Sequence, residues 1–387
     1  MDALIVGRAI SLMWSLPSLL SRSGFNVDAI TTSSLLRVSK FVRKVDRAGS
    51  YDEMVRLAYA RICNRAIPYD WVIACDDDTV RDLSRMDWPE GFEPRYLPRT
   101  EVGQLSHIYS KIGLSQVLSA GGVKTPLFRV ATNCQDAVAA ANELGYPVLI
   151  KADSGNGGNC VWECKNDRDV RKLEDVFKAE PMLVQRRIEG RELDLSAIYF
   201  EQKLVHFAYS VIEWSLPQFA PSVIRTYYPL PLVAEEIFEE VSTLGRVLNA
   251  NGFVTIGCIE AADGSGRYYF EADMRTNVWI DFSSFYGEDE KSRIRAWFSN
   301  GAYLCKENIR GDAGCLPVTI PYFQRIALWE LMVNRYHVWK YIPWTDTKMI
   351  LTLLCAHAVM PVARTMMPSR LRQMVKRRML AVGVPFP

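Results

Sequence analysis

Residues 259–277 read I-E-A-A-D-G-S-G-R-Y-Y-F-E-A-D-M-R-T-N, and this stretch decides how the rest of the chain is interpreted. The turn-forming D-G-S-G in its first half predicts a β-hairpin. Because side chains alternate along a strand, Tyr269, Glu271 and Asp273 are expected on one face. Pairing of the strands around the turn would place Glu260 beside Glu271. Three carboxylates in one place repel each other unless a cation lies among them, and oxygen ligands suit Mg²⁺ or Mn²⁺.

The segment E-A-D-M-R at 271–275 resembles the last metal-binding segment of the ATP-grasp superfamily, which follows the pattern E-x-N-x-R. Asp273 stands where the family usually has Asn. The resemblance implies Glu260, Glu271 and Asp273 as metal ligands. It also implies a catalytic role for Arg275, whose guanidinium forms a fixed fork for a phosphate or carboxylate. Acid pairs on strands mostly mark solvated faces, so the prediction depends on three further segments in the family's order.

Composition sets limits on this interpretation. The chain has 387 residues, 49% of them hydrophobic and 23% charged, which is typical of a globular protein with room for two or three domains. The net charge of +2 gives no reason to expect a nucleic-acid partner. Nine cysteines without a C-x-x-C pair predict neither a disulfide framework nor a zinc site, and they favour a cytoplasmic location. The first residues lack the basic region of a signal peptide.

Residues 1–103 are predicted to form an open α/β domain with a mostly parallel sheet, because apolar runs alternate with helical stretches. No G-x-G-x-x-G follows the first run, so a dinucleotide site is not predicted. The acidic triplet at 76–78 is interpreted as helix capping by Asp78 or Thr79 rather than as a metal site. The domain resembles the small N-terminal domain that precedes an ATP-grasp fold.

Two lysines are candidates for phosphate binding. The helix predicted after Ser110 begins with Lys111 and is closed by a Gly-Gly pair, as in the family segment whose lysine reaches the nucleotide phosphates. An apolar strand ends at Lys151 and is followed by a glycine-rich loop whose backbone N–H groups could hold phosphate oxygens. A surface lysine and a flexible turn are the alternatives. The predicted loop contacts are Ser154, Gly155, Gly157 and Gly158.

A third segment resembles the hinge between the two lobes of ATP-grasp proteins. The resemblance assigns adenine contacts to the backbone of Gln185, Arg186, Arg187 and Ile188, and contact with the ribose hydroxyls to Glu192. The family often has Glu at the Gln185 position, and two arginines are unusual there, but a backbone contact would tolerate both changes. The alternative interpretation is an exposed charged turn.

Residues 303–387 depart from the family pattern and are predicted to form a helical extension. The run 349–363 contains no Asp, Glu, Lys or Arg, but a membrane span needs about 20 apolar residues, and Pro361 interrupts this run. The basic tail that follows could make weak peripheral contact with an anionic membrane surface. A buried helix followed by a solvated basic one is the more common arrangement.

The sequence therefore predicts a combined α/β and α+β fold. Residues 1–103 form the N-terminal domain, 104–302 a two-lobed ATP-grasp domain with its hinge near 185–188, and 303–387 the extension. The resemblance implies ATP-dependent ligation of a small-molecule carboxylate to an amine through an acylphosphate, with ATP and Mg²⁺ (or Mn²⁺). Two alternatives stay open: a kinase built on the same fold, and a non-catalytic nucleotide-binding scaffold.

Overall fold

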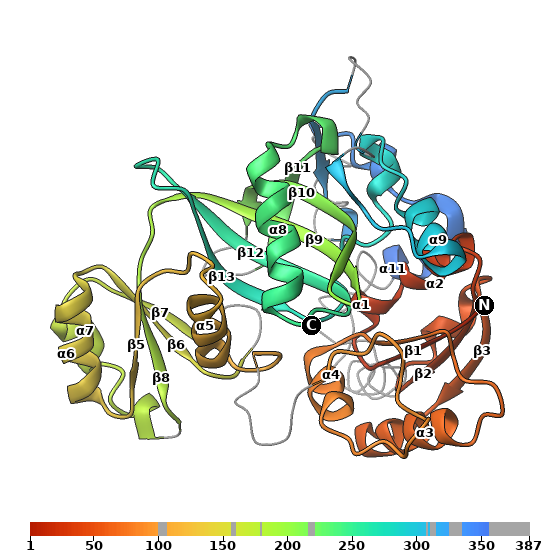
Figure 1. The fold of residues 1–387 in the computed structure, drawn as a ribbon, viewed down its shortest axis with the longest axis horizontal. Coiled ribbons are helices and arrows are strands. Elements are labelled where there is room, and N and C mark those ends of the chain that lie inside the picture. The colour runs from red at the N-terminus through yellow and green to blue at the C-terminus, as the bar shows by residue number, and fades with distance from the viewer. Residues whose placement is uncertain are drawn as a thin grey trace, which may run out of the picture.

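The computed structural model describes residues 1–99, 107–155, 160–178, 180–215, 221–306, 309, 315–324 and 335–355. The described strands form three sheets, which belong to an N-terminal domain, a small lobe and a large lobe. Figure 1 shows the small lobe on the left and the N-terminal domain at the lower right, with the large lobe between and above them.

The N-terminal domain is built on a four-stranded sheet in the order β3-β2-β1-β4, with every neighbouring pair parallel. The predicted open α/β sheet is therefore confirmed. Helix α4 is capped by Asp76 rather than by the predicted Asp78 or Thr79, because the Asp76 carboxylate accepts from the Thr79 N–H at 3.1 Å. The elements are β1 (Asp2–Gly7), α1 (Ile10–Met13), α2 (Leu16–Arg22), β2 (Asn26–Thr31), η1 (Leu35–Val38), β3 (Val42–Arg47), α3 (Tyr51–Cys63), β4 (Trp71–Ala74) and α4 (Asp77–Ser84).

The small lobe is an antiparallel sheet in the order β5-β8-β6-β7. One face packs on α6 and α7 around Ala137, Val148 and Val184, and this core is separate from the rest of the molecule. The opposite face, which bears Lys151 and Gln185, is turned toward the large lobe. The elements are α5 (Lys111–Ala120), β5 (Phe128–Ala131), α6 (Cys134–Leu144), β6 (Val148–Ala152), β7 (Val161–Cys164), α7 (Asp167–Arg171), η2 (Val176–Lys178) and β8 (Met182–Arg186).

The large lobe is a six-stranded antiparallel sheet in the order β13-β12-β9-β10-β11-β14. Helix α8 covers one face with Ile237, Val241 and Leu244. The other face, which we call the open face, carries the candidate site. The elements are β9 (Gly190–Phe200), β10 (Lys203–Ser215), β11 (Ser222–Tyr228), η3 (Leu230–Leu232), α8 (Glu235–Val247), β12 (Gly252–Ala261), β13 (Arg267–Asp273), η4 (Ser283–Tyr286), α9 (Glu290–Asn300) and β14 (Val318–Pro321).

The N-terminal domain and the large lobe share one hydrophobic core. Trp71 of β4 stacks on Phe253 of β12 with ring centres 5.1 Å apart, and it meets Phe200 of β9 edge-on at 4.8 Å. Aromatic pairs of this kind add to the free energy gained by burying apolar surface. The two parts therefore hold each other in place, while the small lobe has its own core and contacts the large lobe through Lys151 and Phe270.

The C-terminal part is not the purely helical extension that the sequence predicted. Strand β14 pairs with β11 and extends the sheet of the large lobe, so residues beyond 303 belong partly to that lobe. Among residues 335–355, the helical elements are η6 (Val338–Tyr341), η7 (Trp344–Asp346) and α11 (Thr347–Leu354). Asp346 accepts from the Ser39 hydroxyl, which ties this segment to the N-terminal domain. The predicted basic tail lies outside the described residues. Within those residues, no helix combines the length and apolar character that a bilayer crossing requires.

Candidate functional site

Lys151 is the next-to-last residue of β6 and lies on the face of the small lobe that is turned toward the large lobe. Its side chain is buried, donates to Gln185 Oε1 at 2.7 Å, and lies 5.0 Å from the ring centre of Phe270 on the large lobe. Burial lowers the pKa of Lys151 to about 8, against the opposing charge of Glu271 and with help from Lys111. A buried ammonium held only by a neutral amide would gain from a bound anion. This geometry supports the predicted phosphate contact.

The start of α5 is attached to the loop that follows β6. The Asp153 carboxylate accepts from the Ser110 hydroxyl at 2.7 Å and from the Ile112 N–H at 2.9 Å. Lys111 Nζ donates to the Gly155 carbonyl at 2.9 Å. Gly155 has φ +131°, which side chains rarely adopt, so this turn requires glycine. Both predicted lysines therefore lie at the same loop.

The remaining loop residues are only partly covered by the structure. The Ser154 hydroxyl lies 3.3 Å from a carboxylate oxygen of Glu180 and is exposed. Gly157 and Gly158 lie outside the described residues. Their predicted phosphate contacts stay predictions.

The structure leaves fewer backbone groups of the predicted hinge that could contact adenine. The Arg186 N–H donates to the Leu127 carbonyl at 2.8 Å, and the Arg187 N–H donates to the Pro147 carbonyl at 3.2 Å. Both N–H groups are thus committed within the small lobe. Of the predicted segment, the backbone groups beyond the end of β8, at Arg187 and Ile188, remain as candidates for the adenine edge, apart from the Arg187 N–H. Both arginine side chains are exposed, as expected if only the backbone contacts a base.

The strand pairing places Glu271 and Asp273 on the open face of the large lobe, but it excludes Glu260. Glu271 lies opposite Gly257, and Asp273 lies opposite Thr255. Glu260 pairs instead with Arg267, three residues farther along the hairpin, and its carboxylate meets Arg191 at 2.6 Å. It lies on the α8 side of the sheet, so its prediction as a metal ligand was wrong.

The cause of this error is a β-bulge at Phe270. Cys258 pairs with Tyr269 while the preceding Gly257 pairs with Glu271, which leaves Phe270 as an extra residue. The bulge reverses the alternation, so Tyr269 points into the α8 core while Glu271 points to the opposite face. A Cβ on Gly257 would lie 3.2 Å from Glu271 Cβ and from the Phe270 ring, so glycine leaves room for both.

A third acid on the open face was missed by the sequence analysis. Asp194 of β9 lies opposite Gly257 of β12 and hence in one row with Glu271. Arg225 of β11 holds it through two hydrogen bonds of 2.6 and 2.8 Å. The alternation of polar residues at Glu192, Asp194 and Ser196 with leucine and alanine was the available signal.

Arg275 connects the end of β13, the strand that carries Glu271 and Asp273, to the N-terminal domain. Its guanidinium donates to Asp77 at 2.6 Å and to Asp273 at 2.6 Å. Asp77 begins α4, directly after β4, so the carboxyl end of the parallel sheet meets the end of β13. The carboxyl ends of parallel strands are where open α/β sheets bind ligands. Arg275 therefore lies where the large lobe meets the carboxyl end of the N-terminal sheet.

Glu271 and Asp273 are suited to a cation that also contacts phosphates. The side chain of Glu271 is exposed. Desolvation by the surrounding protein, followed by the charge of Asp273, nevertheless raises its pKa to about 7. Burial also raises the pKa of Asp273, against the charge of Arg275. In the described part of the chain no three His, Cys, Asp or Glu side chains gather to hold a metal by themselves. Mg²⁺ is commonly held by one or two carboxylates plus substrate phosphates, so this pair fits it.

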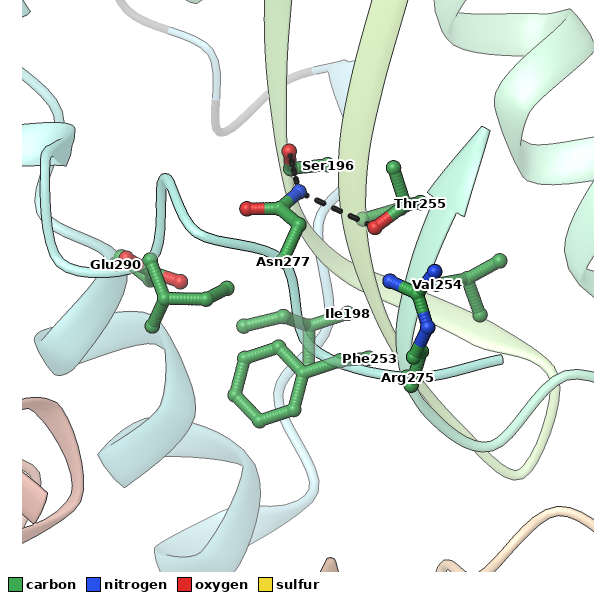
Figure 2. Close-up of a pocket in the computed structure, with 10 residues that line it drawn as sticks. Ser196, Ile198, Phe253, Val254, Thr255, Arg275, Asn277 and Glu290 are labelled. Atoms are coloured by element: carbon green, nitrogen blue, oxygen red, sulfur yellow. Dashed lines mark hydrogen bonds between the residues drawn. The ribbon is translucent and has the colours of Figure 1, made fainter. Parts of the chain in front are cut away.

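A small cavity lies beside Asp273, between the open face and α9. Figure 2 shows Asn277 donating to Ser196 at 2.6 Å and to Thr255 at 3.1 Å, with Glu290 across the cavity. Its volume of about 10 Å³ accommodates roughly one water. Burial, followed by the charge of Asp281, raises the pKa of Glu290 to about 7. Asn277 lines this cavity together with Glu290.

Comparison with known proteins agrees with this geometry. Residues 108–271 match the family model of the ATP-grasp domain. The fold is similar to an ADP complex of N5-carboxyaminoimidazole ribonucleotide synthetase, with TM-score 0.62 and 17% identity over 86% of this chain and 85% of that chain. It is also similar to the biotin carboxylase domain of Hydrogenobacter thermophilus 2-oxoglutarate carboxylase, solved with MgADP and bicarbonate (0.58, 17%, 80% and 72%). A third similar structure is the L-amino acid ligase from Bacillus licheniformis (0.53, 14%, 80% and 77%).

The small lobe offers Lys111 and the buried Lys151, and the large lobe that faces it offers the paired carboxylates, which is the arrangement expected of an ATP-grasp domain. Residues 108–271 match the ATP-grasp domain and the fold is similar to solved ATP-grasp structures, so the resemblance predicted from the sequence and the predicted fold class are confirmed. At identities of 12–17%, the solved structures establish the fold.

Proposed function

We propose that the protein is an ATP-dependent ligase that joins a small-molecule carboxylate to an amine through an acylphosphate. The observation that carries the proposal is that Lys151 of the small lobe lies near enough to Glu271 of the large lobe for their charges to interact. Lys151 of the small lobe lies against Phe270, the residue next to Glu271 on the large lobe. Phosphoryl transfer chiefly requires this kind of positioning and charge stabilisation.

The chain's residues divide this work by position. Lys111, Lys151 and the loop from Ser154 would hold the phosphates of ATP, and Glu271 and Asp273 would hold Mg²⁺ (or Mn²⁺). The metal would neutralise charge on the transferring phosphoryl group. No side chain is required as a covalent nucleophile, because the substrate carboxylate attacks the phosphorus atom and ADP leaves.

The nucleotide would lie with its adenine at the Ile188 backbone and its ribose hydroxyls at Glu192, which opens β9 next to the hinge. The neighbours solved with ADP and MgADP support this placement. The acceptor would enter between the large lobe and the N-terminal domain, where Arg275 bridges the two parts. The cavity beside it, lined by Asn277 and Glu290, accommodates about one water, so the acceptor would lie outside this cavity.

Trapping with hydroxylamine tests this function. The full chain is incubated with ATP, Mg²⁺, a library of carboxylic acids and hydroxylamine, and hydroxamates are detected by mass spectrometry. An acylphosphate gives a hydroxamate together with ADP. The matched control is Glu271→Gln, which keeps the size of the side chain but removes its negative charge, and it should give neither product.

The two alternatives predict other outcomes. A kinase would give a phosphate ester that hydroxylamine leaves intact. A scaffold would bind ADP without consuming ATP under any condition. Either result would replace the ligase proposal.

We also propose a cytoplasmic location, which the nine cysteines support because none forms a disulfide. Contact of the basic tail with anionic membranes stays a proposal. It predicts that vesicles containing phosphatidylserine retain the full chain but not a chain ending at residue 364. Equal retention of both chains would exclude this contact.

A further inference from the structure

A larger pocket lies between the N-terminal domain and the large lobe, far from the candidate nucleotide site. Its lining includes Asp70, which precedes β4, Glu201 in the turn after β9, and Lys203, which begins β10. The pocket therefore lies at the amino end of the parallel sheet, whereas Asp77 and Arg275 meet at the carboxyl end. A six-residue strand such as β1 separates these ends by about 17–20 Å. Figure 1 shows α9, which also lines the pocket, on the side of the molecule opposite the small lobe.

Part of the lining is aromatic and well packed. Trp297 of α9 is 7% exposed, stacks on Phe200 with ring centres 5.5 Å apart, and donates from Nε1 to the Tyr96 hydroxyl at 3.2 Å. Tyr96 has φ +58° and Glu201 has φ +51°, a backbone region that residues other than glycine rarely adopt. Strain of this kind persists only where the surrounding structure fixes it, and it is common at ligand sites. The aromatic lining suits the apolar body of a small molecule.

The polar part of the lining carries charges of both signs that do not neutralise each other. Arg95 and Glu201 are exposed, and within the described residues neither side chain forms an ion pair or a hydrogen bond. Lys203 also has no ion pair among those residues, and its ammonium lies 5.8 Å from the ring centre of Trp297. Gly301 marks the C-terminal end of α9, which has no basic residue in its last turn and carries partial negative charge. The pocket thus offers cations for an anionic group and negative charge for a cationic one.

We propose that this pocket binds a small zwitterion with an apolar body, in the size class of a free amino acid. Arg95 and Lys203 receive its carboxylate, Glu201 and the end of α9 receive its ammonium, and the apolar part lies against Trp297. The volume of about 380 Å³ is near the lower limit of small-molecule sites, which fits a ligand of this size. The inference does not depend on the proposed function, because the pocket shares no residue with the candidate nucleotide site.

The test measures binding of L-leucine, L-methionine, L-phenylalanine and L-tryptophan to the full chain by saturation-transfer difference NMR. At least one should bind with a dissociation constant of about 1 mM or lower, as expected for a ligand of roughly a dozen non-hydrogen atoms. The amino acid that binds best is then compared with the matching amine, which lacks the carboxylate, and with the matching acid, which lacks the amino group. Each analogue should bind about tenfold more weakly, because one charge-assisted contact is lost.

Variants of the exposed charges then locate the site. In Glu201→Gln, the amino acid and its acid analogue should bind within about twofold of each other, because the carboxylate that distinguishes them is gone. In the double variant Arg95→Gln/Lys203→Gln, the same should hold for the amino acid and its amine analogue. The matched controls Arg56→Gln and Glu236→Gln change exposed charges outside the pocket and should bind like the wild type.

Three results would overturn the inference. The first is that none of the four amino acids binds, and the second is that the wild type binds the best amino acid and both analogues equally well. The third is wild-type affinity and selectivity in Glu201→Gln and in the double variant. An amino acid held in the candidate active site would give this third result, because its binding would not depend on Glu201, Arg95 or Lys203.

Discussion

Replacing Arg225 by Met removes one partner of a buried ion pair on the open face of the large lobe. Arg225 is 6% exposed and Asp194 is 8% exposed. The guanidinium makes two hydrogen bonds to Asp194, of 2.6 and 2.8 Å, and donates a third to the Ser222 hydroxyl at 2.8 Å. Methionine keeps much of the packing volume, so the variant isolates the loss of charge and donors.

The expected loss is large because Asp194 would be left charged, buried and unpaired. At an effective dielectric constant of about 20, opposite charges about 3 to 4 Å apart attract by roughly 4 to 5 kcal/mol. Removing one partner of a buried pair typically costs about 3–5 kcal/mol. We therefore expect the free energy of unfolding to fall by about 3–5 kcal/mol in Arg225→Met. The double variant Arg225→Met/Asp194→Leu should recover most of this loss, since no charge is then stranded.

Urea unfolding followed by tryptophan fluorescence measures the effect, and the midpoint should fall by roughly 1 M in the single variant. Arg129→Met is the matched control: Arg129 also forms a bidentate pair, with Glu143, but both side chains are about half exposed. Its midpoint should stay close to wild type, because water screens such pairs. If Arg225→Met unfolded at the wild-type midpoint, or the double variant were no more stable than the single one, the reasoning would be refuted.

Three further predictions concern the site and the pH dependence of stability. Asp273→Asn should keep measurable ATP turnover but need several-fold more Mg²⁺ for half-saturation. Asp273→Ala should lose about 100-fold or more in turnover, as for a lost metal-orienting group. If Asp273→Ala responded to Mg²⁺ like the wild type, Asp273 would be excluded as a ligand. Glu260→Gln should leave Mg²⁺ half-saturation within about twofold of wild type, because its carboxylate lies on the other face; a large increase would restore it as a ligand. His206 is buried and accepts from Arg293 at 2.8 Å, and burial holds its pKa well below 6.5. In the unfolded chain His206 takes up a proton near pH 6.5, and in the folded chain it does not. The free energy of unfolding should therefore fall by about 1.4 kcal/mol per pH unit below that point. An unchanged dependence of the free energy of unfolding on pH in His206→Gln would contradict this.

Local patterns predicted those parts of the site that a short stretch of chain determines. Helix α5 begins at Lys111 as the sequence predicted, and β6 ends one residue after the predicted Lys151, because helix starts and strand ends depend on neighbouring residues. Contacts between distant elements were not predictable in this way. Arg275 meets Asp77 across 198 positions, and this contact exists only because two sheets meet at that point. The predicted nucleotide contacts agree with this geometry, and binding measurements will test them.

The β-bulge at Phe270 shows why strand alternation alone could not define the carboxylate site. In a regular strand, Glu271 would share the face of Tyr269, whose ring is 2% exposed in the core beneath α8. Two carboxylates on that face would be buried among apolar side chains, which is costly without compensating partners. One extra residue moves Glu271 and Asp273 to the open face, where Lys151 approaches Phe270 from the small lobe. The same residue therefore reverses the alternation and contacts Lys151, the candidate for phosphate binding, so the candidate metal and phosphate sites lie close together.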